Sequence, residues 1–123
     1  MKIAIASDDG KNIASHFGRT RGFIIYDVED FRIKNKEYLE NTFTGHVRGL
    51  SEEEHHADRH GAILSALRGC QAVISCGMGQ RIYNELRANG MEAFIVNETD
   101  ADQAIDLYLK NALQDNPGKG CDH

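Results

Sequence analysis

Residues 71–96 read QAVISCGMGQRIYNELRANGMEAFIV, and this stretch decides the fold. Nearly continuous apolar residues at positions 71–76 predict a strand that is covered on both faces. Residues 80–89 carry apolar side chains at helical spacing, which predicts an amphipathic helix that stops at Gly90. A second short apolar run at residues 92–96 predicts another buried strand. Strand, helix and strand in this order predict a right-handed crossover between parallel strands.

The helical pattern recurs on both sides of this stretch. Downstream, residues 100–113 predict a helix because apolar residues recur at helical spacing and Thr99 or Asp100 can cap its start. Upstream, residues 56–68 predict a helix that ends at Gly69. Alternation of strands and helices is typical of an α/β fold.

Three further strands are predicted nearer the start of the chain, at residues 3–7, 22–27 and 31–43. The first is apolar at nearly every position, so we expect it to be buried. A turn-like stretch separates the second from the third, which indicates a hairpin. The third alternates apolar and charged residues, as an exposed antiparallel or edge strand does. The sequence therefore predicts a mixed five-stranded sheet.

Length and charge limit the class of protein. The chain has 123 residues, of which 41% are hydrophobic, and a net charge of −5. We expect one domain at residues 1–115 and a flexible tail at residues 116–123. The acidic balance argues against nucleic-acid binding. Short apolar runs, and three cysteines that fit reduced thiols, favour a cytoplasmic protein without a membrane span. We expect a monomer or a weak homo-oligomer.

Residues 15–19, SHFGR, form the first candidate site, in an irregular loop after the first strand. His16 offers a neutral imidazole, Gly18 allows close approach of the backbone, and Arg19 brings a fixed cation. Such a set suits an anionic metal cluster or a phosphate. In the alternative interpretation, which the spacing alone favours, Phe17 fills the core while His16 and Arg19 are solvated.

Residues 76–81, CGMGQR, form the second candidate site, between a buried strand and a helix. Gly77 and Gly79 permit a tight turn, and the amides at the helix start attract negative charge. Ile82 stands where a dinucleotide-binding fingerprint has its third glycine, so no ordinary Rossmann cofactor is predicted. Cys76 lies where open α/β sheets bind ligands, but it can equally pack in the core.

Histidines are concentrated in a loop and a possible helix start at residues 46–60. They are His46, His55, His56 and His60. The last two are four residues apart and could share a metal, although the glutamate of a zinc-peptidase motif is missing. Cys121 and His123 could add ligands for zinc, nickel or copper. The alternative function is therefore a divalent-metal-binding adaptor, whereas the plainer interpretation is a solvated polar segment.

Asp8 and Asp9 follow the first strand and are similar to the paired carboxylates that hold magnesium in nucleases. No further carboxylate at a fixed place completes a phosphoester hydrolase site. We therefore interpret residues 7–10, SDDG, as a turn stabilised by local side-chain hydrogen bonds.

Five stretches of the chain match the pattern of one known family. They are IAIASDDG (3–10), SHFGR (15–19), GFIIYDVE (22–29), VISCGMGQR (73–81) and LRANGMEAF (86–94). Together they resemble the dinitrogenase iron–molybdenum cofactor biosynthesis family, which includes NifX-like and NafY-like carriers and the C-terminal domain of NifB-type proteins. The resemblance covers about residues 1–113.

This resemblance implies a three-layer α/β/α fold with a ribonuclease-H-like motif, and a non-catalytic carrier of the iron–molybdenum cofactor or a related metal–sulfur cluster. A cluster donor or acceptor protein would be the partner. The resemblance makes His16 the leading ligand. With the two candidate sites above, the expected binding residues are His16, Phe17, Gly18, Arg19, Cys76, Gly77, Met78, Gly79 and Arg81. We expect the two groups to face each other beyond the carboxyl ends of neighbouring central strands. The cysteine trio of a cluster-building radical enzyme is missing, so the chain is predicted to hold its cargo without synthesising it.

Overall fold

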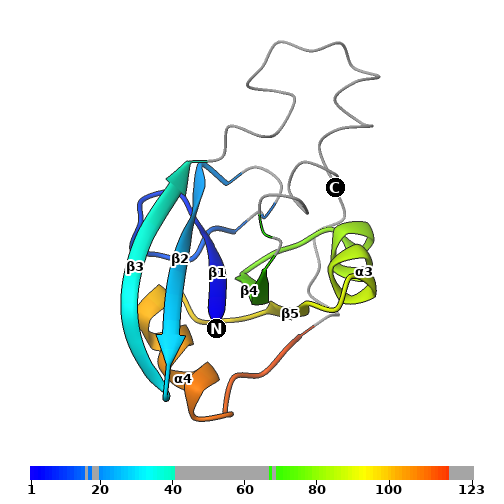
Figure 1. Ribbon diagram of the computed structural model, residues 1–123. Coiled ribbons are helices and arrows are strands. Elements are labelled where there is room, and N and C mark those ends of the chain that lie inside the picture. Colours follow the sequence, from blue (N-terminus) through cyan, green and yellow to red (C-terminus); the bar gives the residue numbers. More distant parts are fainter. Residues whose placement is uncertain (16, 18–19, 41–66, 68, 117–123) are drawn as a thin grey trace.

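The computed structural model describes residues 1–15, 17, 20–40, 67 and 69–116. A five-stranded sheet forms the centre of the molecule (Figure 1). Its strands are β1 (Lys2–Ser7), β2 (Gly22–Glu29), β3 (Arg32–Glu40), β4 (Cys70–Ser75) and β5 (Glu92–Ile95). Their order across the sheet is β3-β2-β1-β4-β5.

The central strand β1 joins two kinds of pairing. β2 pairs antiparallel with β1 and β3, whereas β4 pairs parallel with β1 and β5. The sheet is therefore mixed, which confirms the prediction. Ser7, Ser75 and Ile95 end the three parallel strands on one side of the molecule, which we call the carboxyl end of the sheet.

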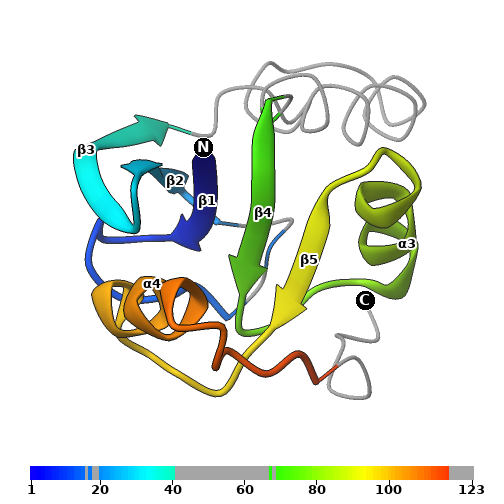
Figure 2. The same cartoon turned by 60° about the horizontal axis from the view of Figure 1, so that its bottom comes forward.

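Two helices cover opposite faces of the sheet, α3 (Gln80–Ala88) and α4 (Ala101–Leu109). Figure 2 shows them on either side of β4 and β5. The α3-side core includes Ala4, Phe17, Phe23, Met78, Leu86 and Ala93, and the α4-side core includes Ile3, Ile5, Ile74, Ala104 and Ile105. Neighbouring residues of β1 alternate between the two cores because strand side chains point to alternate faces. These layers confirm the α/β class and are compatible with a ribonuclease-H-like motif.

Helix α3 ends where the sequence predicts, at a glycine. Gly90 has a φ of +82°, a conformation that costs glycine little and other residues more. The N–H of Gly90 donates to Arg87 O and that of Met91 donates to Leu86 O, each at 3.1 Å. This double closure of the last turn directs the chain straight into β5.

Helix α4 is shorter than predicted: it ends at Leu109, whereas the sequence predicts an end at residue 113. Its start is confirmed: Asp100 caps it by accepting a hydrogen bond from a first-turn N–H at 3.1 Å. Asn111, with a φ of +59°, lies outside the helical region and stops the helix. Leu113 nevertheless packs against the α4-side core, so apolar spacing continues past the helix.

Strand β3 spans part of the predicted residues 31–43 and is exposed along its whole length, as expected of an edge strand. Asp30 and Phe31, both with positive φ, form the turn that joins it to β2. The predicted helix at residues 56–68 lies outside the described residues except for Leu67. The domain boundary at residue 115 stays a prediction. No helix among the described residues is long and apolar enough to span a membrane.

Candidate functional site

Two loops leave the carboxyl end of the sheet from neighbouring strands. The first follows β1 and contains residues 15–19, and the second follows β4 and leads through residues 76–79 into α3. β1 and β4 run side by side in parallel, with Ile5 opposite Ile74. The two loops therefore begin close together.

Backbone hydrogen bonds join these loops. Phe17 N–H donates to Gly77 O at 2.9 Å, and Cys76 N–H donates to Ala14 O at 3.1 Å. The buried Ser75 hydroxyl lies 3.2 Å from Ala14 O and 2.8 Å from Gly77 O, so one side chain bridges both loops. The structure thus brings Phe17 and Gly77 together. The other members of the first motif, His16, Gly18 and Arg19, lie outside the described residues.

The base of the first loop is also bonded to the segment that opens α4. Ile13 N–H donates to Thr99 O at 2.7 Å, and Ala101 N–H donates to Lys11 O at 3.1 Å. An isolated bridge between residues 12 and 100 lies between these contacts. Residues 11–14 are therefore part of the scaffold.

Phe17 and Met78 point into the α3-side core. Each is 1% exposed, and the Phe17 ring packs against Phe23 with the ring centroids 5.4 Å apart. The expected packing of Phe17 in the core is confirmed, whereas the expectation that His16 and Arg19 are solvated concerns residues outside the described part of the chain. Both side chains anchor their loops in the core. Phe17 and Met78 could therefore contact a ligand only through their backbone atoms.

Cys76 packs on the other face, against the α4-side core. Its thiol donates to Glu98 O at 3.0 Å. Burial, and then the negative charge of Glu98, raise the pKa of the Cys76 thiol above its usual range. The thiol is therefore protonated near neutral pH, and the thiolate is the form that binds metals. The structure does not group Cys76 with Phe17 and Met78.

The second loop presents the start of α3. Gly79 caps this helix without a side-chain hydrogen bond, and the first turn has no acidic residue. The helix dipole and the N–H groups of the first turn, which have no acceptor within the helix itself, favour an anion. The Arg81 side chain is 84% exposed, with Nε 3.8 Å from Glu85 Oε1, and adds positive charge. Gly77 is buried and its N–H lies 3.4 Å from Ser75 Oγ, so this N–H faces the protein interior.

The carboxylates after β1 hold the first loop in shape. Asp9 Oδ1 accepts from the N–H groups of Asn12 at 2.7 Å and Lys11 at 2.8 Å. These bonds, led by that of Asn12, hold the pKa of Asp9 well below its usual range. Asp8 Oδ1 accepts from Arg21 N–H at 2.8 Å. The turn interpretation is confirmed. Both carboxylates accept hydrogen bonds from backbone N–H groups, and a magnesium ion would have to displace these bonds.

Tyr38 is a residue of this end of the sheet that the sequence reasoning missed. From the edge strand β3, its ring passes over Gly22 of β2, and its hydroxyl donates to Ser7 O at 2.9 Å. A Cβ on Gly22 would lie 2.5 Å from both Cζ and the hydroxyl oxygen of Tyr38. Only glycine leaves room for the ring. A glycine opening one strand of a hairpin, with an aromatic residue late in the other strand, is the signal that could have indicated this contact.

Among the described residues, no group of three or more His, Cys, Asp or Glu side chains could hold a metal ion. The remaining metal-ligand candidates lie outside the part of the chain that the structure describes: His46, His55, His56, His60, Cys121 and His123. Their roles stay predictions.

Comparison with known proteins agrees with the resemblance. The family model described as "Dinitrogenase iron-molybdenum cofactor" matches residues 1–111. An uncharacterized protein of Methanocaldococcus jannaschii, MJ0580, is 32% identical over 114 residues, which are 93% of this chain and 90% of that protein. Protein NifX of Azotobacter vinelandii is 31% identical over 98 residues, 80% of this chain but 58% of NifX. The crystal structure of PH0822 superposes with a TM-score of 0.70 at 26% identity, covering 94% of this chain and 95% of that one.

Proposed function

The chain belongs to the dinitrogenase iron–molybdenum cofactor family, and on this premise we propose that it is a small cytoplasmic carrier of an iron–molybdenum-type or related metal–sulfur cluster, or of its precursor. It would accept this cargo from a donor protein and release it to an acceptor protein, without catalysing a reaction on it. The family description and the similarity to NifX support a role related to this cofactor.

The observation that carries the proposal is the hydrogen bond from Phe17 N–H to Gly77 O, at 2.9 Å. It holds the chain neighbour of His16 beside the turn that leads into α3. This turn lies at the carboxyl end of the sheet, where open α/β folds bind their ligands. In the proposal His16 supplies an imidazole ligand, Arg19 a cation, and the start of α3 its N–H groups.

An anionic metal–sulfur cluster matches the chemistry of these groups. Imidazole is a ligand that iron accepts readily, and a helix start binds anions through its N–H groups and dipole. The guanidinium groups of Arg19 and Arg81 would add donors and positive charge. We leave Cys76 out of the ligand set because its thiol is protonated and donates to Glu98 O.

Anaerobic reconstitution with an iron–molybdenum–sulfur cluster tests the proposal. After gel filtration, iron, molybdenum and sulfide are measured in the protein peak and the visible spectrum is recorded. We expect the unaltered chain to retain the cluster in a fixed ratio. His16→Ala should weaken retention about tenfold or more, because a lost ligand costs at least the equivalent of one decade in affinity.

Two arginines provide a matched comparison. Arg19→Ala should reduce retention, whereas Arg21→Ala makes the same change two positions later, outside the proposed site, and should leave it unchanged. Unaltered retention and an unaltered spectrum in His16→Ala would overturn the assignment of His16. Tight binding of zinc, nickel or copper that is lost in His56→Ala and His60→Ala, together with no cluster retention, would favour the divalent-metal adaptor instead.

A further inference from the structure

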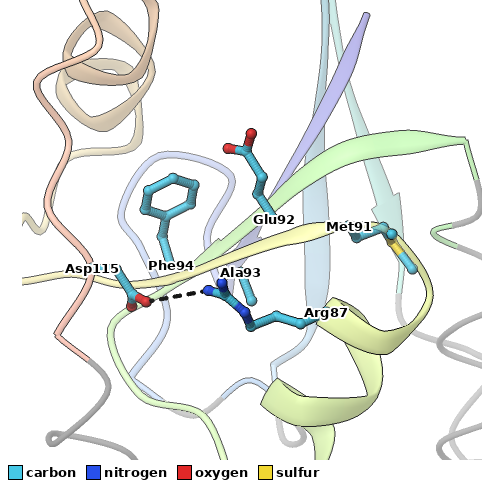
Figure 3. A pocket seen from close by; sticks show the side chains of 7 residues that line it. Arg87, Met91, Glu92, Ala93, Phe94 and Asp115 are labelled. Carbon is cyan, nitrogen blue, oxygen red and sulfur yellow. Dashed lines mark ion pairs between the residues drawn. The ribbon is translucent and has the colours of Figure 1, made fainter.

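The two edge strands of the sheet, β5 and β3, are covered to different degrees by the chain itself. At β5, Ile95 N–H donates to Asp115 Oδ1 at 2.9 Å, and Asn116 N–H donates to Ile95 O at 2.8 Å. Figure 3 shows Asp115 directed toward Arg87 of α3, whose Nη1 lies 3.9 Å from Asp115 Oδ2. At β3, no segment within the described part of the chain pairs with the outer side of the strand. The β3 edge can therefore accept another strand.

Strand β3 also carries much of the exposed apolar surface. All nine of its residues are exposed, so no helix buries either face of the strand. Five large apolar side chains are exposed among the described residues, and four of them lie on β3 or in the turn before it. They are Phe31, Ile33, Tyr38 and Leu39. Exposed apolar side chains that gather on one element indicate a contact surface.

The pairing of β2 with its neighbours determines which backbone groups of β3 face outward. Met1 and Val28 exchange two backbone hydrogen bonds, at 2.7 and 3.0 Å, so Val28 directs its groups to β1. Because these groups alternate along a strand, residues 23, 25 and 27 direct theirs to β3. Their partners in the register are Leu39, Glu37 and Asn35. The N–H and C=O groups of the residues between and beyond them therefore point outward, at Lys36, Tyr38 and Glu40.

The charges of β3 are divided between its two halves. The first half holds three cations, Arg32, Lys34 and Lys36, and the second half holds two anions, Glu37 and Glu40. A parallel copy of the strand would bring like charges together, whereas an antiparallel copy brings the basic half opposite the acidic half. A second copy of the chain, related by a two-fold axis, supplies such an antiparallel strand. The strand is therefore complementary to itself.

We propose that β3 pairs antiparallel with β3 of a second copy, about a two-fold axis at Tyr38. Each Lys36 then lies opposite Glu40 of the second copy, and the outward groups of residues 36, 38 and 40 form the ladder. An axis at Lys36 or at Glu37 would instead place that charge opposite its own copy. The pairing joins the two five-stranded sheets into one. It does not depend on the proposed carrier function.

Two lysines on this edge do not prevent the pairing. Lysine on an edge strand normally discourages association, because its charge is left without a partner. Here Lys34 Nζ lies 2.6 Å from Glu29 Oε2, and Lys36 Nζ lies 3.2 Å from Asp102 Oδ1, so both charges are compensated within the chain. Pairing along one strand buries less than a standard interface of about 1,200–2,000 Å². We therefore expect a weak dimer in equilibrium with the monomer.

Sedimentation velocity over a wide range of protein concentration tests the proposal. The unaltered chain should shift from monomer to dimer as the concentration rises. Glu40→Lys should raise the dissociation constant about tenfold, because two pairs of opposite charge become two pairs of like charge. Glu37→Lys changes the net charge equally but lies opposite Leu39 of the second copy, so it should leave the constant nearly unchanged. Circular dichroism checks that each variant is folded.

Mixing two variants provides a sharper measurement. Lys36→Glu should also weaken the dimer on its own. Mixed with Glu40→Lys, it should form a heterodimer more tightly than either variant pairs with itself, because every residue at position 36 then faces the opposite charge at position 40. No other surface of the molecule predicts this rescue.

Cross-linking tests the position of the axis. In Tyr38→Cys the two new cysteines lie opposite each other, with Cα atoms about 5.5 Å apart, which is within reach of a disulfide. Mild oxidation should therefore cross-link this variant, whereas Leu39→Cys should give no more dimer than the unaltered chain. A chain that stays monomeric at every concentration would overturn the proposal. A dimer that Glu40→Lys leaves intact and Tyr38→Cys does not cross-link would overturn it as well, because another surface would then join the copies.

Discussion

Replacing Gly22 with alanine should destabilise the fold through a collision at the β2–β3 pairing. The added Cβ would lie 2.5 Å from two atoms of the Tyr38 ring and 2.7 Å from Leu39 O. The Tyr38 ring is partly exposed and can swing away, but it then loses the hydrogen bond to Ser7 O. Leu39 O is a backbone atom, so relieving that contact requires the two strands to separate locally.

The expected loss can be summed from these two effects. Overpacking against a fixed backbone costs about 1–3 kcal/mol, and the lost hydrogen bond costs about 1 kcal/mol. We therefore expect Gly22→Ala to lower the free energy of unfolding by about 2–4 kcal/mol. Urea denaturation followed by circular dichroism measures it directly.

Two companion variants separate the contributions. In Gly22→Ala/Tyr38→Ala the ring is gone but the Leu39 carbonyl remains, so part of the destabilisation by alanine should persist relative to Tyr38→Ala. Gly69→Ala introduces strain without a collision, because Gly69 has a φ of +94° and open space around its Cβ position; it should cost about 1–2 kcal/mol. A loss below about 0.5 kcal/mol in Gly22→Ala, the size of an ordinary surface change, would refute the reasoning.

Three further predictions concern Asp9, Cys76 and Asp115. The N–H groups that bind Asp9 hold its pKa below the ordinary value, so its charge stabilises the fold above about pH 4 and this contribution is lost as the pH falls. The urea midpoints of the unaltered chain and of Asp9→Asn should therefore converge when they are measured from neutral to acid pH. Midpoints that keep a constant difference would contradict this. Burial raises the pKa of the Cys76 thiol, so iodoacetamide should alkylate Cys76 slowly at neutral pH and faster above about pH 9, as measured by peptide mass spectrometry. Alkylation at neutral pH as fast as that of a free cysteine peptide would argue against a protonated, enclosed thiol. Asp115→Ala removes the acceptor of both Ile95 N–H and the Tyr83 hydroxyl. It should lower the free energy of unfolding, measured by urea denaturation, by about 1–3 kcal/mol. An unchanged midpoint would show that this contact does not hold the C-terminal segment.

Sequence reasoning succeeded where one local pattern determines one element. The stripe at residues 80–89 followed by Gly90 specifies a helix and its end, and the short apolar runs specify the strands. The predicted end of α4 was wrong for a physical reason. Leu113 packs against the α4-side core as a helical residue would, although Asn111 has already broken the helix. Apolar spacing reports burial, and burial continues where the helix does not.

The sequence predicted that the two candidate loops lie together, but it did not predict the directions of their side chains. The parallel neighbours β1 and β4 bring Phe17 and Gly77 together, as the order of the elements implies. Side-chain directions after a strand depend on the turn that follows, and adjacent sequence positions did not indicate that Cys76 and Met78 pack on opposite faces. Tyr38 meets Gly22 only through the β2–β3 register, which shifts after Asp27, and no local pattern reports such a shift.

The bonds from residues 11–13 to the opening of α4 divide the first loop into two parts with different freedom to evolve. Substitutions before Ala14 disturb packing shared by two elements and are constrained by folding itself. Substitutions between Ala14 and Thr20 leave those bonds intact. Phe17 is the exception in this second part of the loop, because its side chain fills the α3-side core. Under the proposed carrier function, transplanting residues 16, 18 and 19 from a homologue, with Phe17 and Thr20 kept, should change ligand preference while preserving thermal stability.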